Sequence, residues 1–168
     1  MTKISQGSSD DTRRLILIRH AHRDNSIREI DNGLSDTGKA QAITLAKHFS
    51  ELASSKSVIF ETSPKLRCQE TLAPLANSLK ASVSINSLLD EQLSQESRLV
   101  FESRVRDYMV SWSKSHSALT IACSHGDWIP AALKEVTGLN LELGKSGWII
   151  LSYSESKWTI EETVLNAR

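Results

Sequence analysis

The chain has 168 residues, a length that fits one compact domain better than two. Hydrophobic residues make up 39% and charged residues 24%, ordinary values for a globular protein that buries a core. The 20 basic and 20 acidic residues balance, so no overall field points to a nucleic acid or a membrane as partner.

The first residues of the chain are polar and contain no apolar segment of the kind found in secretion signals. We therefore expect a polar tail, residues 1–12, before a single domain, residues 13–168. No stretch approaches the roughly 20 apolar residues needed to cross a bilayer. The two cysteines, Cys68 and Cys123, fall in a predicted helix and a predicted strand, and we expect free thiols in a reducing cytoplasm.

The first predicted element is a strand over residues 15–18, a continuous apolar run typical of a strand buried on both faces of a parallel sheet. The polar segment 19–33 that follows has no clear period. From Ser35, the predicted N-cap, the apolar residues recur at helical spacing. The buried face of this helix is predicted to contain Ala42, Leu45, Ala46, Phe49 and Leu52.

A short strand is predicted over residues 58–60. Ser63 and Pro64 then have the pattern of a helix start, with serine as cap and proline at the first helical position. Pro74 falls inside this helix and is expected to kink it or divide it in two. The apolar side of the helix is predicted to contain Leu66, Leu72, Ala73, Ala76 and Leu79.

The second half of the chain continues the alternation of strands and helices. A strand over 83–85 and a loop over 86–95 are followed by a helix, then by an apolar strand over 118–123 and a helix over 129–136 that ends near Gly138. The buried stripe of the first of these helices is predicted to contain Phe101, Val105, Tyr108, Met109 and Trp112.

Residues 148–153 and 158–163 complete the chain as two strands, predicted to pair as a hairpin at or near a sheet edge. The whole pattern predicts an α/β fold, a three-layer sandwich with a mostly parallel central sheet and helices on both faces. Ligands of such sheets bind at the carboxyl ends of the strands. Segments 19–20, 63–67 and 124–125 all fall there.

These segments contain the residue types that phosphoryl transfer requires, namely a nucleophile and cations for the equatorial oxygens. Arg19 and His20 leave the end of the first strand, and His125 leaves a later strand in the same way. Arg67 stands early in a helix, where the amide groups and the helix dipole also attract phosphate. Asp90 and Glu91 lie on a loop from which a carboxylic acid could reach the site.

Four segments resemble, in order, motifs of the histidine phosphatase (phosphoglycerate mutase-like) superfamily. Residues 17–21 are similar to its Arg-His-Gly signature, 33–42 to its L-T/S-x-x-G-x-x-Q-A helix opening, 63–71 to its S-P-x-x-R-x-x-Q/E-T segment and 124–126 to its second histidine motif. Because all four occur in family order, the chain is identified as a member, of a short bacterial type that resembles the phosphohistidine phosphatases.

The resemblance implies a metal-independent phosphatase with no cofactor. His20 would attack phosphorus and become a phosphohistidine. Arg19, Arg67 and His125 would surround the phosphoryl oxygens, and Arg23 matches an R-H-G-x-R variant that adds a phosphate ligand. The substrate would be a phosphorylated small molecule or a phosphoprotein, whereas the oligomeric state is open.

Residues 89–91 resemble the family's L-x-E segment, which makes Glu91 the candidate acid, with Asp90 as the alternative. The glycines that often follow this segment are missing here. Ala21 replaces the commoner glycine of the first motif. The 33 residues between Glu91 and His125 leave little chain for a closing lid, which favours hydrolysis over phosphate shuttling.

Three other functions compete with phosphomonoester hydrolysis. A phosphohistidine protein phosphatase would use the same site. Residues 20–24 also fit H-x-H-x-D, the start of a binuclear metal-hydrolase motif, but Asn25 stands where that motif continues with histidine and two arginines would oppose a cation. A non-catalytic module that binds phospho-ligands is expected to have lost a motif histidine, and both are present.

Overall fold

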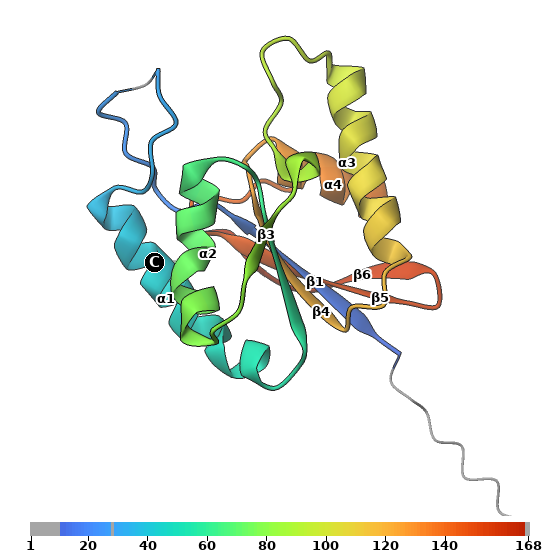
Figure 1. Ribbon diagram of the computed structural model, residues 1–168. Coiled ribbons are helices and arrows are strands. Elements are labelled where there is room, and N and C mark those ends of the chain that lie inside the picture. The colour runs from blue at the N-terminus through green and yellow to red at the C-terminus, as the bar shows by residue number, and fades with distance from the viewer. Residues whose placement is uncertain (1–10, 28, 167–168) are drawn as a thin grey trace, which may run out of the picture.

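The computed structural model describes residues 11–27 and 29–166. Within these ranges a six-stranded sheet lies between two pairs of helices (Figure 1). The first half of the chain forms β1 (Arg13–Arg19), α1 (Asp36–Ser54), β2 (Val58–Thr62), α2 (Leu66–Ser78), β3 (Val83–Ile85) and a 3₁₀ turn (Ser87–Leu89). The second half forms α3 (Arg98–Ser113), β4 (Leu119–Ser124), α4 (Trp128–Thr137), β5 (Trp148–Ser154) and β6 (Lys157–Val164). Of the predicted polar tail, residues 1–10 lie outside the described residues.

The strands follow the order β3-β2-β4-β1-β5-β6. The first four of these are parallel, and β5 and β6 are antiparallel to their neighbours. The predicted α/β sandwich with a mostly parallel sheet and a C-terminal hairpin is confirmed. At the hairpin tip, Glu155 and Ser156 both have positive φ, 51° and 61°, as a two-residue turn between twisted strands requires.

Strand β1 lies at the centre of the sheet, between β4 and β5. Residues 15–18 are completely buried, as the continuous apolar run predicts. Leu15 and Leu17 pack with side chains of α3 and α4, whereas Ile16 and Ile18 pack with those of α1 and α2. Because successive side chains of a strand point to opposite faces, this one strand contributes to both halves of the core.

A predicted end or face is confirmed in each of three helices, although Ala46 and Leu52 of the predicted α1 face are only partly buried. The Ser35 side chain accepts a hydrogen bond from the Gly38 backbone N–H and caps α1. Gly138 ends α4 in the left-handed conformation, with φ 75°. All five predicted stripe residues of α3 are buried. No helix within residues 11–27 and 29–166 is long and apolar enough to span a membrane.

The predicted start of α2 is wrong. The helix begins at Leu66, and the side chain of its N-cap residue, Lys65, makes no cap. Ser63 Oγ accepts a hydrogen bond from the Lys65 N–H at 3.3 Å, ahead of the first helical residue. Instead, Asp31 Oδ2 accepts a hydrogen bond from the Leu66 N–H at 2.9 Å. A carboxylate from a distant loop therefore caps the first helical N–H, while the Ser63 hydroxyl also contacts His125 Nε2 at 2.8 Å.

Two further details of α2 differ from the predictions. Of the two outcomes predicted for Pro74, a kink or a division of the helix, the division did not occur, since one helix continues through this residue. Leu66 is 40% exposed, and the helix buries Arg67 and Cys68 in its first turn instead. A charged residue occupies this buried position because it faces the carboxyl edge of the sheet and not the core.

Candidate active site

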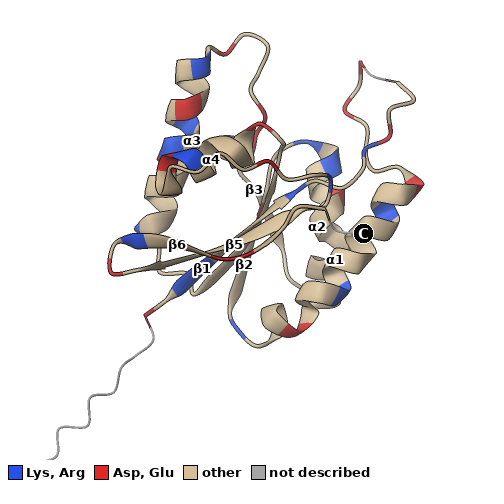
Figure 2. Ribbon diagram, turned by 180° about the vertical axis from the view of Figure 1, so that it is seen from behind, with Lys and Arg blue, Asp and Glu red and all other residues tan. Residues whose placement is uncertain are grey.

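The predicted site residues meet at the carboxyl ends of β1, β2 and β4. His20, Arg67 and His125 are only 4%, 3% and 2% exposed. The rings of His20 and His125 lie edge to face, with centroids 5.3 Å apart. Figure 2 shows acidic and basic segments interspersed along α3, whereas basic segments gather beside the start of α2, at this edge of the sheet.

His20 has a defined tautomer. Its Nδ1 lies 2.8 Å from the backbone carbonyl oxygen of Ala21, which can only accept a hydrogen bond. Nδ1 therefore carries the proton, and Nε2 is the unprotonated nitrogen with the lone pair. Burial, together with the positive charge of Lys145, lowers the pKa of His20 to about 2. The ring is thus neutral at physiological pH, the state that a nucleophile needs.

Residues of the other motifs hold the loop after His20. Thr71 accepts a hydrogen bond from the Ala21 N–H at 3.0 Å and donates one to the Arg67 carbonyl at 2.7 Å. Gln41 accepts one from the His22 N–H at 2.9 Å. The motif residues Thr71 and Gln41 therefore position the backbone around the histidine.

Two small residues match the close packing around this loop. The Ala21 methyl is buried with Leu34 and Ala42, so the replacement of glycine is accommodated there. Gly126 lies against Arg19, and a Cβ there would come within 2.5 Å of the guanidinium carbon. The glycine of the second histidine motif therefore leaves space for the arginine of the first.

Three buried guanidinium Nε–H groups have no hydrogen-bond partner in the part of the chain that the structure describes, and they belong to Arg19, Arg23 and Arg67. All three arginines also act on Lys145. Burial and the charges of Arg19, Arg67 and Arg23, in that order, lower the pKa of this lysine to about 8. Four cationic side chains thus form one electropositive cluster that is suited to a phosphate dianion.

His125 also has a defined tautomer. Arg67 Nη2 lies 3.3 Å from Nδ1, and because a guanidinium only donates, Nδ1 is the acceptor. Nε2 carries the proton and lies 2.8 Å from Ser63 Oγ, which in turn donates to Asp90 Oδ1 at 3.2 Å. Burial, and then the charges of Arg67 and Lys65, lower the pKa of His125 to about 2.

The two candidate acids lie on opposite edges of the His125 ring. Glu91 Oε2 is 2.7 Å from Arg67 Nη2 and 3.7 Å from His125 Nδ1, and this side chain is 37% exposed. Asp90 is 13% exposed, and its Oδ1 already accepts from Ser63 and from the Glu91 N–H at 2.9 Å. Glu91 is therefore the carboxylate with access to solvent and to the cationic cluster.

Sequence reasoning missed Lys145, whose Nζ lies 3.3 Å from His20 Nε2. This lysine belongs to the segment that enters β5, far from His20 in sequence. Because β5 is antiparallel to β1, the start of β5 meets the end of β1. The only signal in the sequence is a lysine between two glycines, Gly144 and Gly147, directly before a strand.

Both cysteines are buried free thiols, as predicted. The Sγ atom of Cys68 lies 3.5 Å from His125 Nε2, a contact with the site that the sequence did not indicate. Burial, the largest cause, raises the pKa of the Cys68 thiol well above its usual value. The thiol therefore stays protonated and is a poor nucleophile.

The side chains of the alternative H-x-H-x-D motif make separate contacts. His20 Nε2 faces Lys145, His22 Nδ1 lies 2.8 Å from Ser35 Oγ, and Asp24 accepts from the Ser26 N–H. Among residues 11–27 and 29–166, no three or more His, Cys, Asp and Glu side chains are grouped to hold a metal ion.

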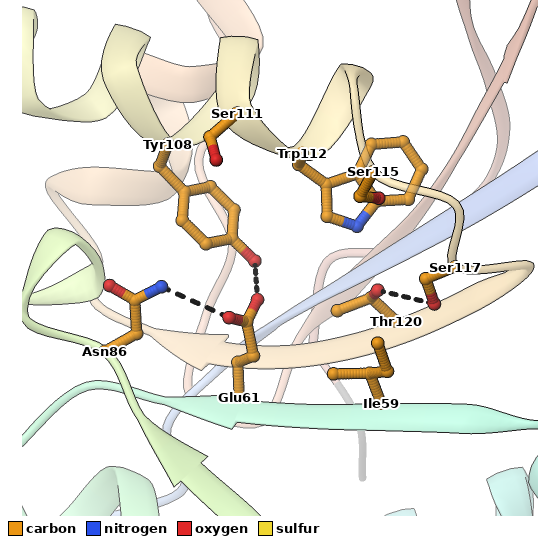
Figure 3. Close-up of a pocket in the computed structure, with 9 residues that line it drawn as sticks. All are labelled: Ile59, Glu61, Asn86, Tyr108, Ser111, Trp112, Ser115, Ser117 and Thr120. Atoms are coloured by element: carbon orange, nitrogen blue, oxygen red, sulfur yellow. Dashed lines mark hydrogen bonds between the residues drawn. The ribbon is translucent and has the colours of Figure 1, made fainter.

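A separate cavity of about 120 Å³ lies between α3 and strands β2 and β4 (Figure 3). Its carboxylate, Glu61, accepts hydrogen bonds from the Tyr108 hydroxyl at 2.6 Å and from Asn86 at 3.2 Å. None of the predicted site residues lines this cavity. It belongs to the packing of α3 on the sheet.

A model of the histidine phosphatase superfamily (branch 1) matches residues 15–95. This range contains the first three of the four motifs, together with His20, Arg67 and Glu91. Residues 15–95 are therefore similar to the histidine phosphatase superfamily, the family that the motifs indicate. This match supports the predicted activity class, a hydrolase of phosphate esters.

Solved structures with similar folds cover most of this chain. Mycobacterial hydrolase 1 is 20% identical, with a TM-score of 0.76 over 93% of this chain and 99% of that one. A mycobacterial glucosyl-3-phosphoglycerate phosphatase is 19% identical, with a TM-score of 0.75 over 93% and 100% of the two chains. A phosphoserine phosphatase from Entamoeba histolytica is 15% identical, with a TM-score of 0.74 over 89% and 95%. No curated protein sequence matches. Similarities at this level of identity show the shared fold.

Proposed function

We propose that this protein is a histidine phosphatase that hydrolyses phosphomonoesters without a metal, through a covalent phosphohistidine on His20. The neutral His20 ring, with Nε2 unprotonated and surrounded by cations, is the observation that carries the proposal. We also propose that residues 13–168 act as one domain. Its two buried thiols suit a reducing cytoplasm.

In the first step, the Nε2 lone pair of His20 forms a bond to phosphorus. The bond from phosphorus to the leaving oxygen breaks, and the bonding electrons stay with that oxygen. The same oxygen takes a proton from the carboxylic acid of Glu91. The imidazole becomes positively charged, and its Nδ1–H remains bonded to the Ala21 carbonyl, which stabilises the charge. Arg19, Arg23 and Arg67 hold the phosphoryl oxygens.

In the second step, water attacks the phosphohistidine. An oxygen–phosphorus bond forms, the bond from phosphorus to Nε2 breaks, and its electrons return to the His20 ring. The Glu91 carboxylate takes a proton from the water and is ready for another cycle. The products are an alcohol and inorganic phosphate, and no electron donor or acceptor is required.

His125 changes its protonation state in this scheme. In the structure its Nδ1 accepts from Arg67, so Nδ1 must gain a proton before it can donate to a phosphoryl oxygen. The negative charge of the bound phosphate ester stabilises the protonated form of the His125 ring. On the other edge of the ring, the hydrogen bonds through Ser63 to Asp90 stabilise the positive imidazolium.

The position of Glu91 favours oxygen leaving groups, because an alkoxide needs a proton to leave and an imidazole leaves more readily. The relatives named above as phosphatases of phosphoserine and of glucosyl-3-phosphoglycerate also support a small phosphate ester. A panel of phosphate esters that includes a phosphohistidine peptide separates the two substrate classes. Hydrolysis of the peptide alone would favour the phosphohistidine phosphatase.

Phosphatase activity is expected to survive exhaustive chelation. The cationic cluster supplies the charge that a metal would otherwise provide. The measurement is phosphate release from an aryl phosphate before and after dialysis against EDTA. Activity lost on dialysis and restored by zinc or manganese would contradict the histidine nucleophile and favour the H-x-H-x-D alternative.

Glu91→Gln is expected to lower turnover of alkyl phosphates by roughly 10²-fold or more, because glutamine keeps the shape of the side chain but cannot exchange a proton. The burst with nitrophenyl phosphate should change much less, since nitrophenolate leaves without a proton. The matched control is Glu102→Gln, on the surface of α3. Equal losses on both substrates would mean that Glu91 positions the substrate, and no loss on either would assign the acid to Asp90 or elsewhere.

A further inference from the structure

Lys145 is the charged group in direct contact with the atom that attacks phosphorus. Its Nζ lies 3.3 Å from His20 Nε2. An ammonium group only donates, and Nε2 is the acceptor because the proton of the ring is on Nδ1, held by Ala21. The contact is therefore a charge-assisted hydrogen bond to the lone pair of the nucleophile.

The backbone around Lys145 is attached to the end of β1 on both sides of the lysine. Before it, the Leu143 carbonyl accepts a hydrogen bond from the Arg19 guanidinium. After it, the Ser146 N–H donates to the His20 carbonyl at 3.3 Å, and the Gly147 carbonyl accepts from the Arg19 N–H at 2.9 Å. The lysine therefore starts from a fixed point beside the histidine, and its side chain is only partly buried.

Charged and titratable groups from several elements face this ammonium. They are Arg19 and His20 at the end of β1, Arg23 in the following loop, Arg67 and Cys68 on α2, and His125 after β4. Most of these groups are positive or neutral, and no carboxylate in the described part of the chain forms an ion pair with Lys145. These neighbours destabilise the positive charge of the Lys145 ammonium until an anionic phosphate binds beside it. This is expected for a group that binds the substrate.

We propose that Lys145 is a catalytic residue of this site, a role that rests on the function proposed above. Before substrate binds, its ammonium bonds to His20 Nε2 and keeps that nitrogen unprotonated. When a phosphate ester arrives, the ammonium turns to a phosphoryl oxygen, which frees the lone pair for attack. The N–H···N hydrogen bond is exchanged for an N–H···O bond, and no proton is transferred.

Two substitutions separate charge from shape. Lys145→Met keeps an unbranched side chain without charge, and Lys145→Arg keeps the charge at high pH. The matched control is Lys157→Met, an exposed lysine at the tip of the hairpin. For each protein, kcat and KM for an aryl phosphate are measured by phosphate release between pH 5 and 10, with inhibition by inorganic phosphate and thermal unfolding alongside.

Lys145→Met is expected to lower kcat/KM at pH 7 by roughly 10- to 10²-fold and to weaken phosphate inhibition, as for loss of one charge-stabilising group. Lys145→Arg should restore most of the activity. The wild-type kcat/KM should fall as the pH rises past about 8, where Lys145 loses its proton and the cation disappears. Arginine stays charged, so that alkaline fall should be absent from Lys145→Arg.

Folded Lys145→Met with kcat/KM within twofold of wild type would overturn the proposal. An equal loss in Lys145→Met and Lys145→Arg, with the alkaline fall unchanged, would also overturn it, because the lysine would then have a structural role. Neither result would affect the phosphohistidine mechanism. A wild-type protein that releases phosphate from no ester, in contrast, would overturn the proposed function and the role of Lys145 with it.

Discussion

His20→Asn is expected to lower kcat by roughly 10⁴-fold or more, because loss of a covalent nucleophile has the largest effect of any substitution in such a site. Asparagine is the informative replacement. Its amide can still donate to the Ala21 carbonyl, as Nδ1 does at 2.8 Å, but it has no nitrogen lone pair with which to attack phosphorus. The loop should keep its conformation while the chemistry is lost.

The measurement combines turnover with trapping of the intermediate. Wild-type protein quenched during turnover of a labelled phosphate ester should carry label that acid releases, as expected for a bond between phosphorus and nitrogen, and His20→Asn should carry none. The matched control is His116→Asn, an exposed histidine that precedes β4, at the opposite end of this strand from the site. Label on the asparagine variant, or activity close to wild type, would contradict His20 as the nucleophile.

Arg67→Ala is expected to lower kcat by on the order of 10² to 10³, as for removal of one group that stabilises charge in a preorganised site. Arg67 is 3% exposed, and its guanidinium contacts His125, Glu91 and Asp31. The substitution removes a cation from the phosphoryl oxygens, and it also removes the ion-pair partner of Glu91. Arg67→Lys should recover part of the loss, since lysine restores the charge without the planar fork.

The fold should survive Arg67→Ala. The two carboxylates that lose their partner are 37% and 43% exposed, so water can solvate them. Circular dichroism and thermal unfolding check this expectation. Arg98→Ala, which removes an exposed arginine paired with Glu102 on α3, is the matched control. A folded Arg67→Ala protein with nearly full activity would show that Arg67 does not bind the phosphoryl group.

The periodicity of the sequence determined the elements and the sides that they bury. A run of four apolar residues, 15–18, predicted a strand covered on both faces, because no polar side chain alternates with the apolar ones. The stripe on α3 predicted its buried face for the same reason, since each signal lies within one element. Motif order also placed His20, Arg67 and His125 at strand or helix ends, where parallel strands bring them together.

The tertiary structure decided every contact that joins distant elements. Asp31 caps α2 in place of Ser63, and Ser63 connects His125 to Asp90. Capping preferences describe neighbours in sequence, so they could not predict that a distant carboxylate caps the helix or that the serine hydroxyl also contacts a buried histidine. The same limit left open whether Asp90 or Glu91 faces the cations. Both are carboxylates on one loop, and the sequence does not say in which direction each side chain points.

Lys145 shows this limit most clearly. Its contact with His20 depends on β5 lying beside β1 and running antiparallel to it, so that the segment entering β5 reaches the end of β1. Hydrophobic periodicity reports how each strand is buried and carries no information on which strand is its neighbour. Chain order therefore determined the elements and most of the site residues. The strand order of the folded sheet decided which lysine contacts the nucleophile.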